Sequence, residues 1–489
     1  MRVNGRQWLG SLHVAGETRR ETRRGRKPVI IGAALLTLAA GAAAATTATA
    51  SAAVQSASGV QSANAVQSAS RAQISTAHLA RSSGQLSVSK QFFGDAVEPY
   101  TGKETAVYRY TLTNARGMSV DILTYGGIIQ EINVPGRSGK TSDVVLGFKT
   151  LQDYVTYDSP PVTANGGPYF GEDIGRYGNR IAKGTFTLSQ PGVGPVTYTV
   201  PVNNGVNSLH GGLVGFGNHI WADQSIQTST EVGVQLTLVS PNGDQAAAAG
   251  TPGCADGCTG YPGEVKDVTT YTLNNQNQLE IHYAVTDESS NLNTVINVTN
   301  HSYFNLAGEN SEAGSAYNQL VQINADKYTP TDSTQIPLGT EVSVAGTPFD
   351  FTTPHTIGSR IDDVSAPDGA PAADPQLLIA QGYDHNWVLN AKTPATTGPD
   401  GLNLAAHAWD PASGRELTVW TDQPGVQFYS GNFLTGTLVG IGGNTYRQGA
   451  GYTFETQHFP NSPNQSNFPS TELDAGKTLT STTIFAFSS

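Results

Sequence analysis

The sequence predicts an all-β fold, a large antiparallel β-sandwich or barrel, because apolar residues recur with a period of two. One predicted strand carries four apolar residues on a single face, Val232, Val234, Leu236 and Leu238, and residues 108–112 alternate in the same way. Gly and Pro punctuate the chain throughout, and no long stretch after residue 88 has the 3.6-residue apolar period of a helix. A chain of 489 residues is long enough to bury a large core in one domain of this class.

The first part of the chain predicts a secreted, extracellular protein with a flexible tether. Residues 1–28 are basic, an apolar run extends from Val29 to about Ala45, and a small-x-small cleavage pattern ends at Ala52. This combination is typical of a signal peptide, here residues 1–52, with a retained membrane anchor as the alternative. Paired arginines leave both Sec and twin-arginine export open. Residues 53–87 are rich in Ala, Ser and Gln, which predicts a tether before a folded domain at 88–489 with no stable membrane span.

Turns are predicted at several polar stretches within the domain. Two alternating runs, 268–273 and 279–285, flank residues 274–278, which we interpret as a hairpin loop. Residues 135–141 look like a phosphate-binding loop, but Val134 stands where that motif needs its first glycine, so a turn is predicted instead. Residues 209–212 look like an esterase oxyanion loop, yet the chain contains no Gly-x-Ser-x-Gly and no His-Glu-x-x-His. A serine hydrolase and a zinc peptidase are therefore not expected.

Composition narrows the range of partners. Only 13% of the residues are charged and the net charge is −12, which argues against nucleic acid and suits a protein that meets neutral solutes. The two cysteines, Cys254 and Cys258, lie in a loop-like stretch, where a local disulfide is the favoured interpretation. Half of a metal site is the alternative, but no second cysteine pair or nearby histidine completes it.

Five segments combine turn glycines with polar side chains that can contact hydroxyl groups. They lie at 175–181, 203–212, 300–305 and 382–386, with a fifth formed by 426–429 together with 454–459. His301 offers an imidazole and Glu455 a carboxylate, and such a pair can give and take a proton across a small polar substrate. Each residue alone also fits a structural role: a surface ion pair for Arg180, a hydrogen-bonded histidine for His210 or His301, and a paired buried carboxylate for Glu455.

Together these motifs resemble the aldose 1-epimerase (galactose mutarotase) family. The resemblance extends from about Gln91 to Phe487 and rests on runs that keep the family's order. They are Gly-Arg-x-x-Asn-Arg-Ile at 175–181, Asn-x-x-Asn-Ser-Leu-His-Gly-Gly at 204–212, Gly-Tyr-Pro-Gly at 260–263, Thr-Asn-His-Ser-Tyr-Phe-Asn-Leu-Ala-Gly at 299–308 and Glu-Thr-Gln-His-Phe-Pro at 455–460. The resemblance implies a galactose mutarotase-like supersandwich in which the sugar lies in an open cleft on a curved sheet.

The resemblance also implies roles for individual residues. It places the general acid on His301, the general base on Glu455, and the sugar-binding residues on Asn179, Arg180, His210, Asp384 and Gln427, with Tyr303 as a candidate for the wall of the cleft. The implied reaction interconverts the α and β anomers of free aldohexoses such as glucose and galactose by opening and reclosing the ring. It needs neither a metal nor another cofactor, and we expect a monomer or a homodimer.

Three features depart from the family pattern, and other functions remain as alternatives. Gly178 stands where alanine is common, residues 245–259 are an insertion expected to reshape the mouth of the cleft, and the leader and tether are additions. A glycosidase or lyase on the same fold would use Asp384 and Glu455 as its two carboxylates. A hexose-6-phosphate epimerase would need more basic residues than Arg180. A tethered, non-catalytic sugar-binding module is the alternative from outside the enzymes.

Overall fold

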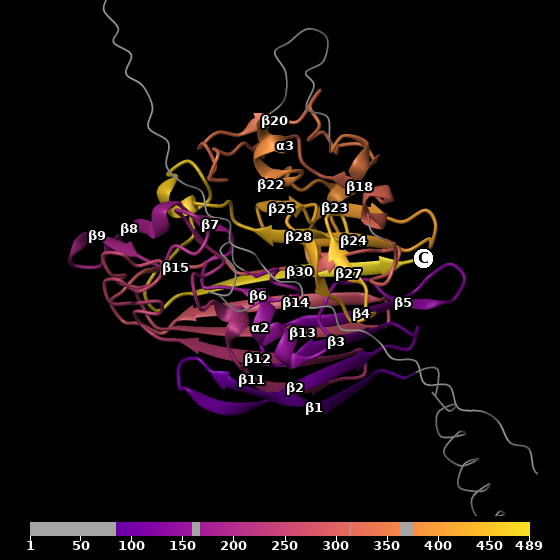
Figure 1. Ribbon diagram of the computed structural model, residues 1–489, viewed down its shortest axis with the longest axis horizontal. Coiled ribbons are helices and arrows are strands. Elements are labelled where there is room, and N and C mark those ends of the chain that lie inside the picture. Colours follow the sequence, from indigo (N-terminus) through magenta and orange to yellow (C-terminus); the bar gives the residue numbers. More distant parts are fainter. Residues whose placement is uncertain (1–84, 159–166, 313, 362–374) are drawn as a thin grey trace, which may run out of the picture. The chain divides into compact units, whose positions relative to one another are not determined.

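The computed structural model describes residues 85–158, 167–312, 314–361 and 375–489 (Figure 1). The chain divides into two compact units, 1–79 and 80–489, and every described residue belongs to the second. The expected signal peptide at 1–52 and residues 53–84 of the tether expected at 53–87 lie outside the described residues. Of the remaining tether residues, Leu86 is buried and Ser87 begins the first strand. Within the described part, no helix combines the length and the apolar character that crossing a membrane requires.

The largest sheet has nine strands and runs through the centre of this unit (Figure 1). Its strands, in spatial order, are β11 (Ala222–Gln227), β12 (Glu231–Ser240), β13 (Val265–Asn274), β14 (Gln278–Asp287), β30 (Thr478–Ser488), β24 (Glu416–Thr421), β23 (Asn403–Trp409), β18 (Leu320–Ile323) and β21 (His355–Thr356). Every neighbouring pair is antiparallel. The predicted all-β, antiparallel fold is therefore confirmed.

Two further sheets pack against it. The six-stranded sheet consists of β17 (Tyr303–Phe304), β28 (Tyr452–Gln457), β25 (Gly425–Tyr429), β22 (Asp384–Val388), β19 (Lys327–Thr329) and β20 (Val342–Ser343). The five-stranded sheet consists of β1 (Ser87–Glu98), β2 (Lys103–Thr113), β3 (Ser119–Leu123), β4 (Ile129–Pro135) and β5 (Thr141–Asp143). Strand β2 contacts β12 and β13, so the five-stranded sheet covers one half of the nine-stranded sheet.

Short ribbons and helices complete the described unit. The ribbons pair β6 (Asp173–Ile174) with β16 (Thr299–Asn300), β7 (Arg180–Ile181) with β10 (Ser208–Leu209), β8 (Thr185–Gln190) with β9 (Gly194–Thr199), β15 (Thr294–Val295) with β29 (Glu472–Leu473), and β26 (Thr435–Val439) with β27 (Thr445–Arg447). The two α-helices among the described residues are α2 (Leu151–Tyr157) and α3 (Pro375–Ala380). Single 3-10 turns lie at Ala182–Gly184, Phe216–Asn218, Ser315–Asn318, Ile357–Ser359, Pro394–Thr396, Pro399–Gly401 and Ser462–Asn464.

One continuous apolar core joins the three sheets. Phe304 of the six-stranded sheet packs edge-on against Phe485 of the nine-stranded sheet, with ring centroids 5.1 Å apart. Phe428 and Phe454 stack in the same layer at 5.4 Å. Because successive side chains of a strand point to opposite faces, the residues next to these phenylalanines point away from the core. That opposite face of the six-stranded sheet is where the polar residues of β22, β25 and β28 gather.

Several local predictions are confirmed. The four apolar residues of β12, from Val232 to Leu238, are all buried on one face. Strands β13 and β14 form the predicted hairpin, with pairing that closes at Leu273 opposite Leu279. Residues 135–141 form the turn between β4 and β5, with no helix following. The two short α-helices were not predicted, because neither is long enough to show a repeating apolar period.

Candidate active site

A cavity of about 410 Å³ lies on the polar face of the six-stranded sheet. Its floor comes from neighbouring strands of that sheet: Asp384 from β22, Tyr429 from β25, Glu455 from β28 and Tyr303 from β17. Seven of the eight residues implied by the family resemblance line it, namely Asn179, Arg180, His210, His301, Tyr303, Asp384 and Glu455. Gln427 lies opposite Glu455 in the β25–β28 register and contacts the cavity only through Asp384.

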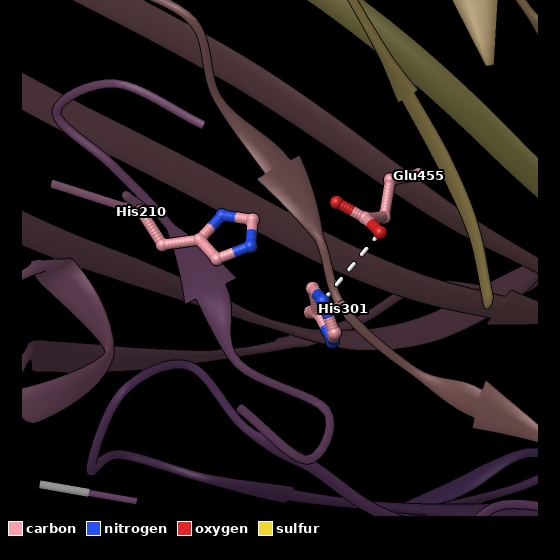
Figure 2. Close-up of side chains that lie close together, drawn as sticks. All are labelled: His210, His301 and Glu455. Carbon is pink, nitrogen blue, oxygen red and sulfur yellow. Dashed lines mark ion pairs between the residues drawn. The ribbon is translucent and has the colours of Figure 1, made fainter. Parts of the chain in front are cut away.

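The proposed acid–base pair is in contact inside this cavity. His301 Nε2 lies 3.5 Å from Glu455 Oε1, and the two side chains are only 5% and 2% exposed. Figure 2 shows both side chains converging, with His210 beside them. Thr453, from the same face of β28, donates a hydrogen bond of 3.0 Å to Glu455 Oε1. Glu455 Oε2 is buried and has no hydrogen-bond partner among the described residues.

The backbone around His301 is fixed by a neighbouring loop. His301 N donates to Glu172 O at 2.9 Å, and Gly171 N donates to His301 O at 3.1 Å, so the peptide groups on both sides are held. Asn300 Nδ2 donates to Gly171 O at 2.9 Å. Gly171 has φ +72°, and a Cβ there would lie 2.1 Å from Ile129 O, so only glycine fits. The imidazole therefore projects from a rigid loop between β16 and β17.

Burial governs the protonation of the pair. It raises the pKa of Glu455 to about 8, with Asp384 adding to the shift and Thr453 and Arg180 opposing it. Burial also lowers the pKa of His301 to about 3. Burial thus drives both groups towards their neutral forms, and this effect outweighs the mutual attraction of an ion pair at 3.5 Å. Neutral imidazole with protonated carboxyl holds one proton in total, the same number as imidazolium with carboxylate.

His210 is held in one tautomer by the backbone. Asn179 N donates a 3.2 Å hydrogen bond to His210 Nδ1, so the ring proton must sit on Nε2. Burial, together with the charges of His301 and Arg180, lowers the pKa of His210 well below its ordinary value, which keeps the ring neutral. His210 therefore presents an N–H donor to the cavity. Both Asn179, at φ 61°, and His210, at φ 48°, occupy the left-handed region that non-glycine residues rarely adopt.

The hydrogen bond from Asn179 N to His210 Nδ1 also decides whether His210 can bind a metal ion. Ligand atoms of His210, His301 and Glu455 all lie within 4.8 Å of one another, close enough to suggest a metal site. A histidine binds a metal through an unprotonated nitrogen, however, and neither nitrogen of His210 is free for this. Nδ1 accepts the Asn179 N–H and Nε2 carries the proton. The trio is better suited to binding hydroxyl groups than to holding an ion.

Arg180 and Asp384 form the charged side of the cavity. Arg180 Nε donates to Asn204 Oδ1 at 3.1 Å, and its backbone N donates to Asn179 Oδ1 at 2.9 Å. Asp384 Oδ1 accepts a 2.7 Å hydrogen bond from Gln427 Nε2. The backbone pairing of Arg180 with Leu209 brings two of the polar segments together. Side-chain amides of the protein thus orient both the cation and the carboxylate.

Several lining residues were not identified from the sequence. Tyr169 packs against both histidines, with ring centroids 4.7 Å from His210 and 5.7 Å from His301. Gln335 contacts both Arg180 and Asp384. Apolar residues of the outer wall come from α3 (Ile379), from the segment that leads into β26 (Phe433 and Leu434) and from β26 itself (Leu438). None of these residues belongs to a recognisable motif, and only their position in the fold reveals them.

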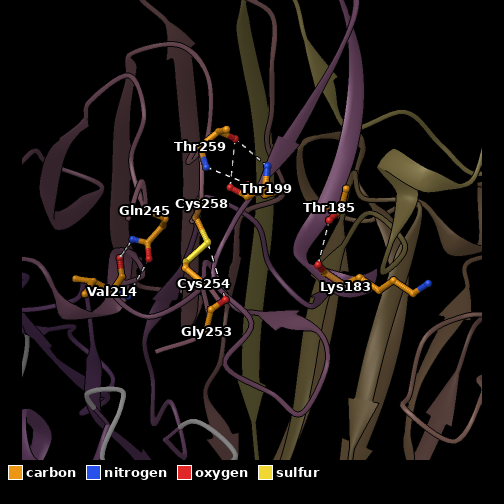
Figure 3. Close-up of a disulfide and its surroundings, with 9 residues drawn as sticks. All are labelled: Lys183, Thr185, Thr199, Val214, Gln245, Gly253, Cys254, Cys258 and Thr259. Atoms are coloured by element: carbon orange, nitrogen blue, oxygen red, sulfur yellow. Dashed lines mark hydrogen bonds between the residues drawn. A yellow bond between two sulfur atoms is a disulfide. The ribbon is translucent and has the colours of Figure 1, made fainter. Parts of the chain in front are cut away.

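The insertion does not shape the cavity as expected. None of residues 245–259 lines it. Instead, Gln245 exchanges hydrogen bonds with the backbone of Val214, in the loop that follows His210. Cys254 and Cys258 are joined in the local disulfide that the sequence favoured, with Cα atoms 5.4 Å apart (Figure 3). The insertion therefore contacts the loop that follows His210 without reaching the cavity itself.

One of the five runs that carry the family resemblance, at 260–263, has a structural role and does not line the cavity. In Gly-Tyr-Pro-Gly at 260–263, the carbonyl groups of Pro262 and Gly263 accept hydrogen bonds of 2.9 and 3.0 Å from Arg176 Nη1. Arg176 is fully buried, and its Nε also donates a hydrogen bond to Ser240 Oγ. This cluster anchors the segment that leads to Asn179 and Arg180, so its residues act on the cavity only through that segment.

Comparisons with known proteins agree with one another. The sequence profile described as aldose 1-epimerase matches residues 108–486. Galactose mutarotase from Mus musculus is 39% identical over 403 residues, which cover 82% of this chain and 99% of the relative. Aldose 1-epimerase from Escherichia coli (strain K12) is 33% identical over 379 residues, covering 77% and 94%.

Solved structures give the same result. A galactose 1-epimerase from Lactobacillus acidophilus NCFM has a TM-score of 0.62 at 26% identity and covers 83% of this chain and 99% of its own. An aldose epimerase homologue from C. elegans has a TM-score of 0.61 at 26% identity, covering 76% and 96%.

Proposed function

Because the chain belongs to the aldose 1-epimerase family, we propose that His301 and Glu455 are its acid–base pair and that the cavity around them binds the sugar. The protein is an isomerase that interconverts the α and β anomers of aldoses. The observation that carries the proposal is the contact of 3.5 Å between the imidazole and the carboxyl group inside a polar cavity.

The reaction needs one acid and one base at the same time. Opening a pyranose requires a proton on the ring oxygen and removal of the proton from the C1 hydroxyl, which breaks the bond between C1 and the ring oxygen and leaves an aldehyde. Rotation about the C1–C2 bond exposes the other face of the carbonyl. Reclosure returns both protons and gives the opposite anomer. Each positioned proton-transfer group contributes about 10²–10⁴ in rate.

A singly protonated pair meets this need in either tautomer. The family resemblance gives the acid role to His301 and the base role to Glu455. Burial favours the proton on Glu455 and a neutral His301, which again leaves one acid and one base. Exchange of the proton between the tautomers needs only the contact between Nε2 and Oε1. We therefore infer that the active form is defined by the number of protons on the pair.

The surrounding residues hold the sugar in register with the pair. His210 donates a hydrogen bond through Nε2–H, Arg180 donates through its guanidinium, and Asp384 accepts. Gln427 orients Asp384 from behind. Since Gln427 and Gln335 each donate an N–H to the carboxyl of Asp384, the group is suited to accept hydrogen bonds from hydroxyls.

Polarimetry tests the proposal directly. Freshly dissolved α-glucose and α-galactose should reach the equilibrium rotation faster with the protein than in buffer alone, in proportion to its concentration. Release of reducing sugar from oligosaccharides should stay at the buffer rate. Hydrolysis without accelerated mutarotation would support a glycosidase instead, and tight glucose binding without acceleration would support a binding module.

We further propose that the protein is secreted after cleavage near Ala52. The basic start, the apolar run and the small residues support a signal peptide, and the disulfide between Cys254 and Cys258 suits an oxidising compartment. Fractionation of the producing cells, followed by N-terminal sequencing, tests this. Full-length protein retained inside the cell would contradict the proposal.

A further inference from the structure

A single side chain, that of Gln335, bridges the cation and the anion of the cavity by a hydrogen bond to each. Its Oε1 accepts a hydrogen bond of 2.6 Å from Arg180 Nη2, and its Nε2 donates one of 2.8 Å to Asp384 Oδ2. Arg180 Nη2 and Asp384 Oδ2 themselves lie 3.7 Å apart. Gln335 lines the cavity but belongs to none of the sequence runs that carry the family resemblance.

Without this amide the two charged groups would close on each other. The side chains of Arg180 and Asp384 are only 5% and 10% exposed, so water screens their attraction weakly. A shift of about 1 Å would bring them to the distance of a direct charge-assisted hydrogen bond. If Arg180 and Asp384 were hydrogen-bonded directly to each other, those donor and acceptor atoms could no longer bind the hydroxyl groups of a sugar. Gln335 gives each charged group a neutral partner and keeps the two apart.

The backbone holds Gln335 in place at a conformational cost. Its φ is 63°, where glycine is favoured over any residue with a side chain. The turn is nevertheless fixed: Asp332 Oδ1 accepts hydrogen bonds of 2.7 and 3.1 Å from the backbone N of Thr334 and Ile336. Asn207 Nδ2 donates to Thr334 O at 3.1 Å. These hydrogen bonds fix the turn in spite of the strain at Gln335, and the fixed turn positions the side-chain amide beside Arg180 and Asp384.

We propose that Gln335 is a specificity-determining residue that holds Arg180 and Asp384 apart, so that they bind different oxygen atoms of one sugar. This inference rests on the proposed sugar-binding function of the cavity. It makes Gln335 a positioning residue for two groups that contact the substrate, remote from the proton transfers of His301 and Glu455. Its effect therefore falls on sugar affinity and on discrimination between hydroxyl patterns.

The first test is Gln335→Gly, which removes the amide and relieves the strained φ. We expect glucose affinity, measured by titration calorimetry, to fall by at least about tenfold. KM should rise by the same factor while kcat changes by less than about threefold. The melting temperature should not fall, which separates this result from general damage. Gln335→Leu, which keeps the length but not the amide, should show the same loss, and Gln224→Ala, at an exposed position on β11, should bind glucose normally.

The second test uses monodeoxyglucoses as ligands for the same variants. In the wild type, removing a hydroxyl held by Arg180 or Asp384 should weaken binding, and in Gln335→Gly that penalty should largely disappear. Unchanged affinity with an unchanged deoxy pattern in both Gln335 variants would overturn the inference, and so would a loss confined to kcat. A wild type that binds glucose but does not accelerate mutarotation would overturn the proposed function alone, because calorimetry still reports on Gln335.

Discussion

His301 Nε2 and Glu455 Oε1 lie 3.5 Å apart, and both side chains are almost completely buried. Two titratable groups at this distance cannot be treated as independent, because the charge of one decides the protonation of the other. The pair as a whole can hold zero, one or two protons. Only the state with one proton contains both an acid and a base. Burial enlarges the pH range of that state, since it raises the pKa of Glu455 and lowers that of His301.

Removing either member of the pair should nearly abolish catalysis. His301→Asn and Glu455→Gln should each reduce enzyme-driven mutarotation, followed by polarimetry, by at least about a hundredfold. A half-buried pair at almost the same distance, outside the cavity, provides the control: His407 Nε2 lies 3.4 Å from Glu416 Oε2 on the nine-stranded sheet. His407→Asn and Glu416→Gln should leave the rate unchanged. Near-normal rates in either active-site variant would refute the assignment.

The contact between the two members of the proposed acid–base pair could be anticipated from the sequence, because His301 and Glu455 lie in runs that keep the family's order. Period-two alternation likewise predicted β12 and the β13–β14 hairpin, since side-chain direction in a strand follows from sequence position alone. The same rule places Glu455 and Phe454 on opposite faces of β28, one towards the cavity and one in the core. Such features depend on local order along the chain.

Features that depend on contacts between distant segments could not be predicted. The tautomer of His210 is set by the backbone N–H of Asn179, 31 positions away. Gln335 acquires its role only because its turn lies beside Arg180, 155 positions away. Residues 245–259 were expected to reshape the mouth of the cleft, but none of them lines the cavity. Gln245 instead donates a hydrogen bond to the backbone of Val214, in the loop that follows His210. Spacing in the sequence carries no information on these distances in space.

The pH dependence of the rate should form a broad plateau. Above about pH 8 Glu455 loses its proton and the pair has no acid, and below about pH 3 His301 gains a second proton and the pair has no base. The rate constant should therefore stay nearly level in between and fall on both sides. Polarimetry in overlapping buffers, corrected for the buffer-catalysed reaction, measures this profile. A narrow maximum between the ordinary pKa values of glutamate and histidine would show that burial does not control the pair.

Loss of the disulfide should weaken one loop and leave catalysis intact. The bond joins residues only 4 positions apart, so its effect on the unfolded chain is small, about 2 kcal/mol at most. The Cys254→Ser, Cys258→Ser double variant should keep its kcat/KM within about twofold, because no residue of 245–259 lines the cavity. Hydrogen exchange should rise within residues 247–258. A large fall in activity would show that the insertion controls the His210 loop more tightly than its bonds through Gln245 indicate.

Glu455 should lower the stability of the fold as the pH rises. The folded protein keeps the proton on Glu455 up to about pH 8, whereas the unfolded chain releases it near the ordinary glutamate pKa of 4.5. Between these values the folded state binds more protons than the unfolded state, so the free energy of unfolding falls as the pH rises, by about 1.4 kcal/mol per pH unit from this group. Glu455→Gln removes the titrating proton and should therefore be more stable than the wild type at pH 8. Near pH 4 the two proteins should be similar.

Urea unfolding at pH 4, 6 and 8 measures this difference, because the contributions of all other groups largely cancel between two proteins that differ only at residue 455. Glu104→Gln on β2 is the control, since Glu104 is exposed and its difference from the wild type should not grow with pH. A stability difference that stays constant from pH 4 to 8 would mean that the folded protein ionises Glu455 as easily as the unfolded chain does. The carboxyl would then be charged at neutral pH, so Glu455 could serve as the base of the pair but not as its acid.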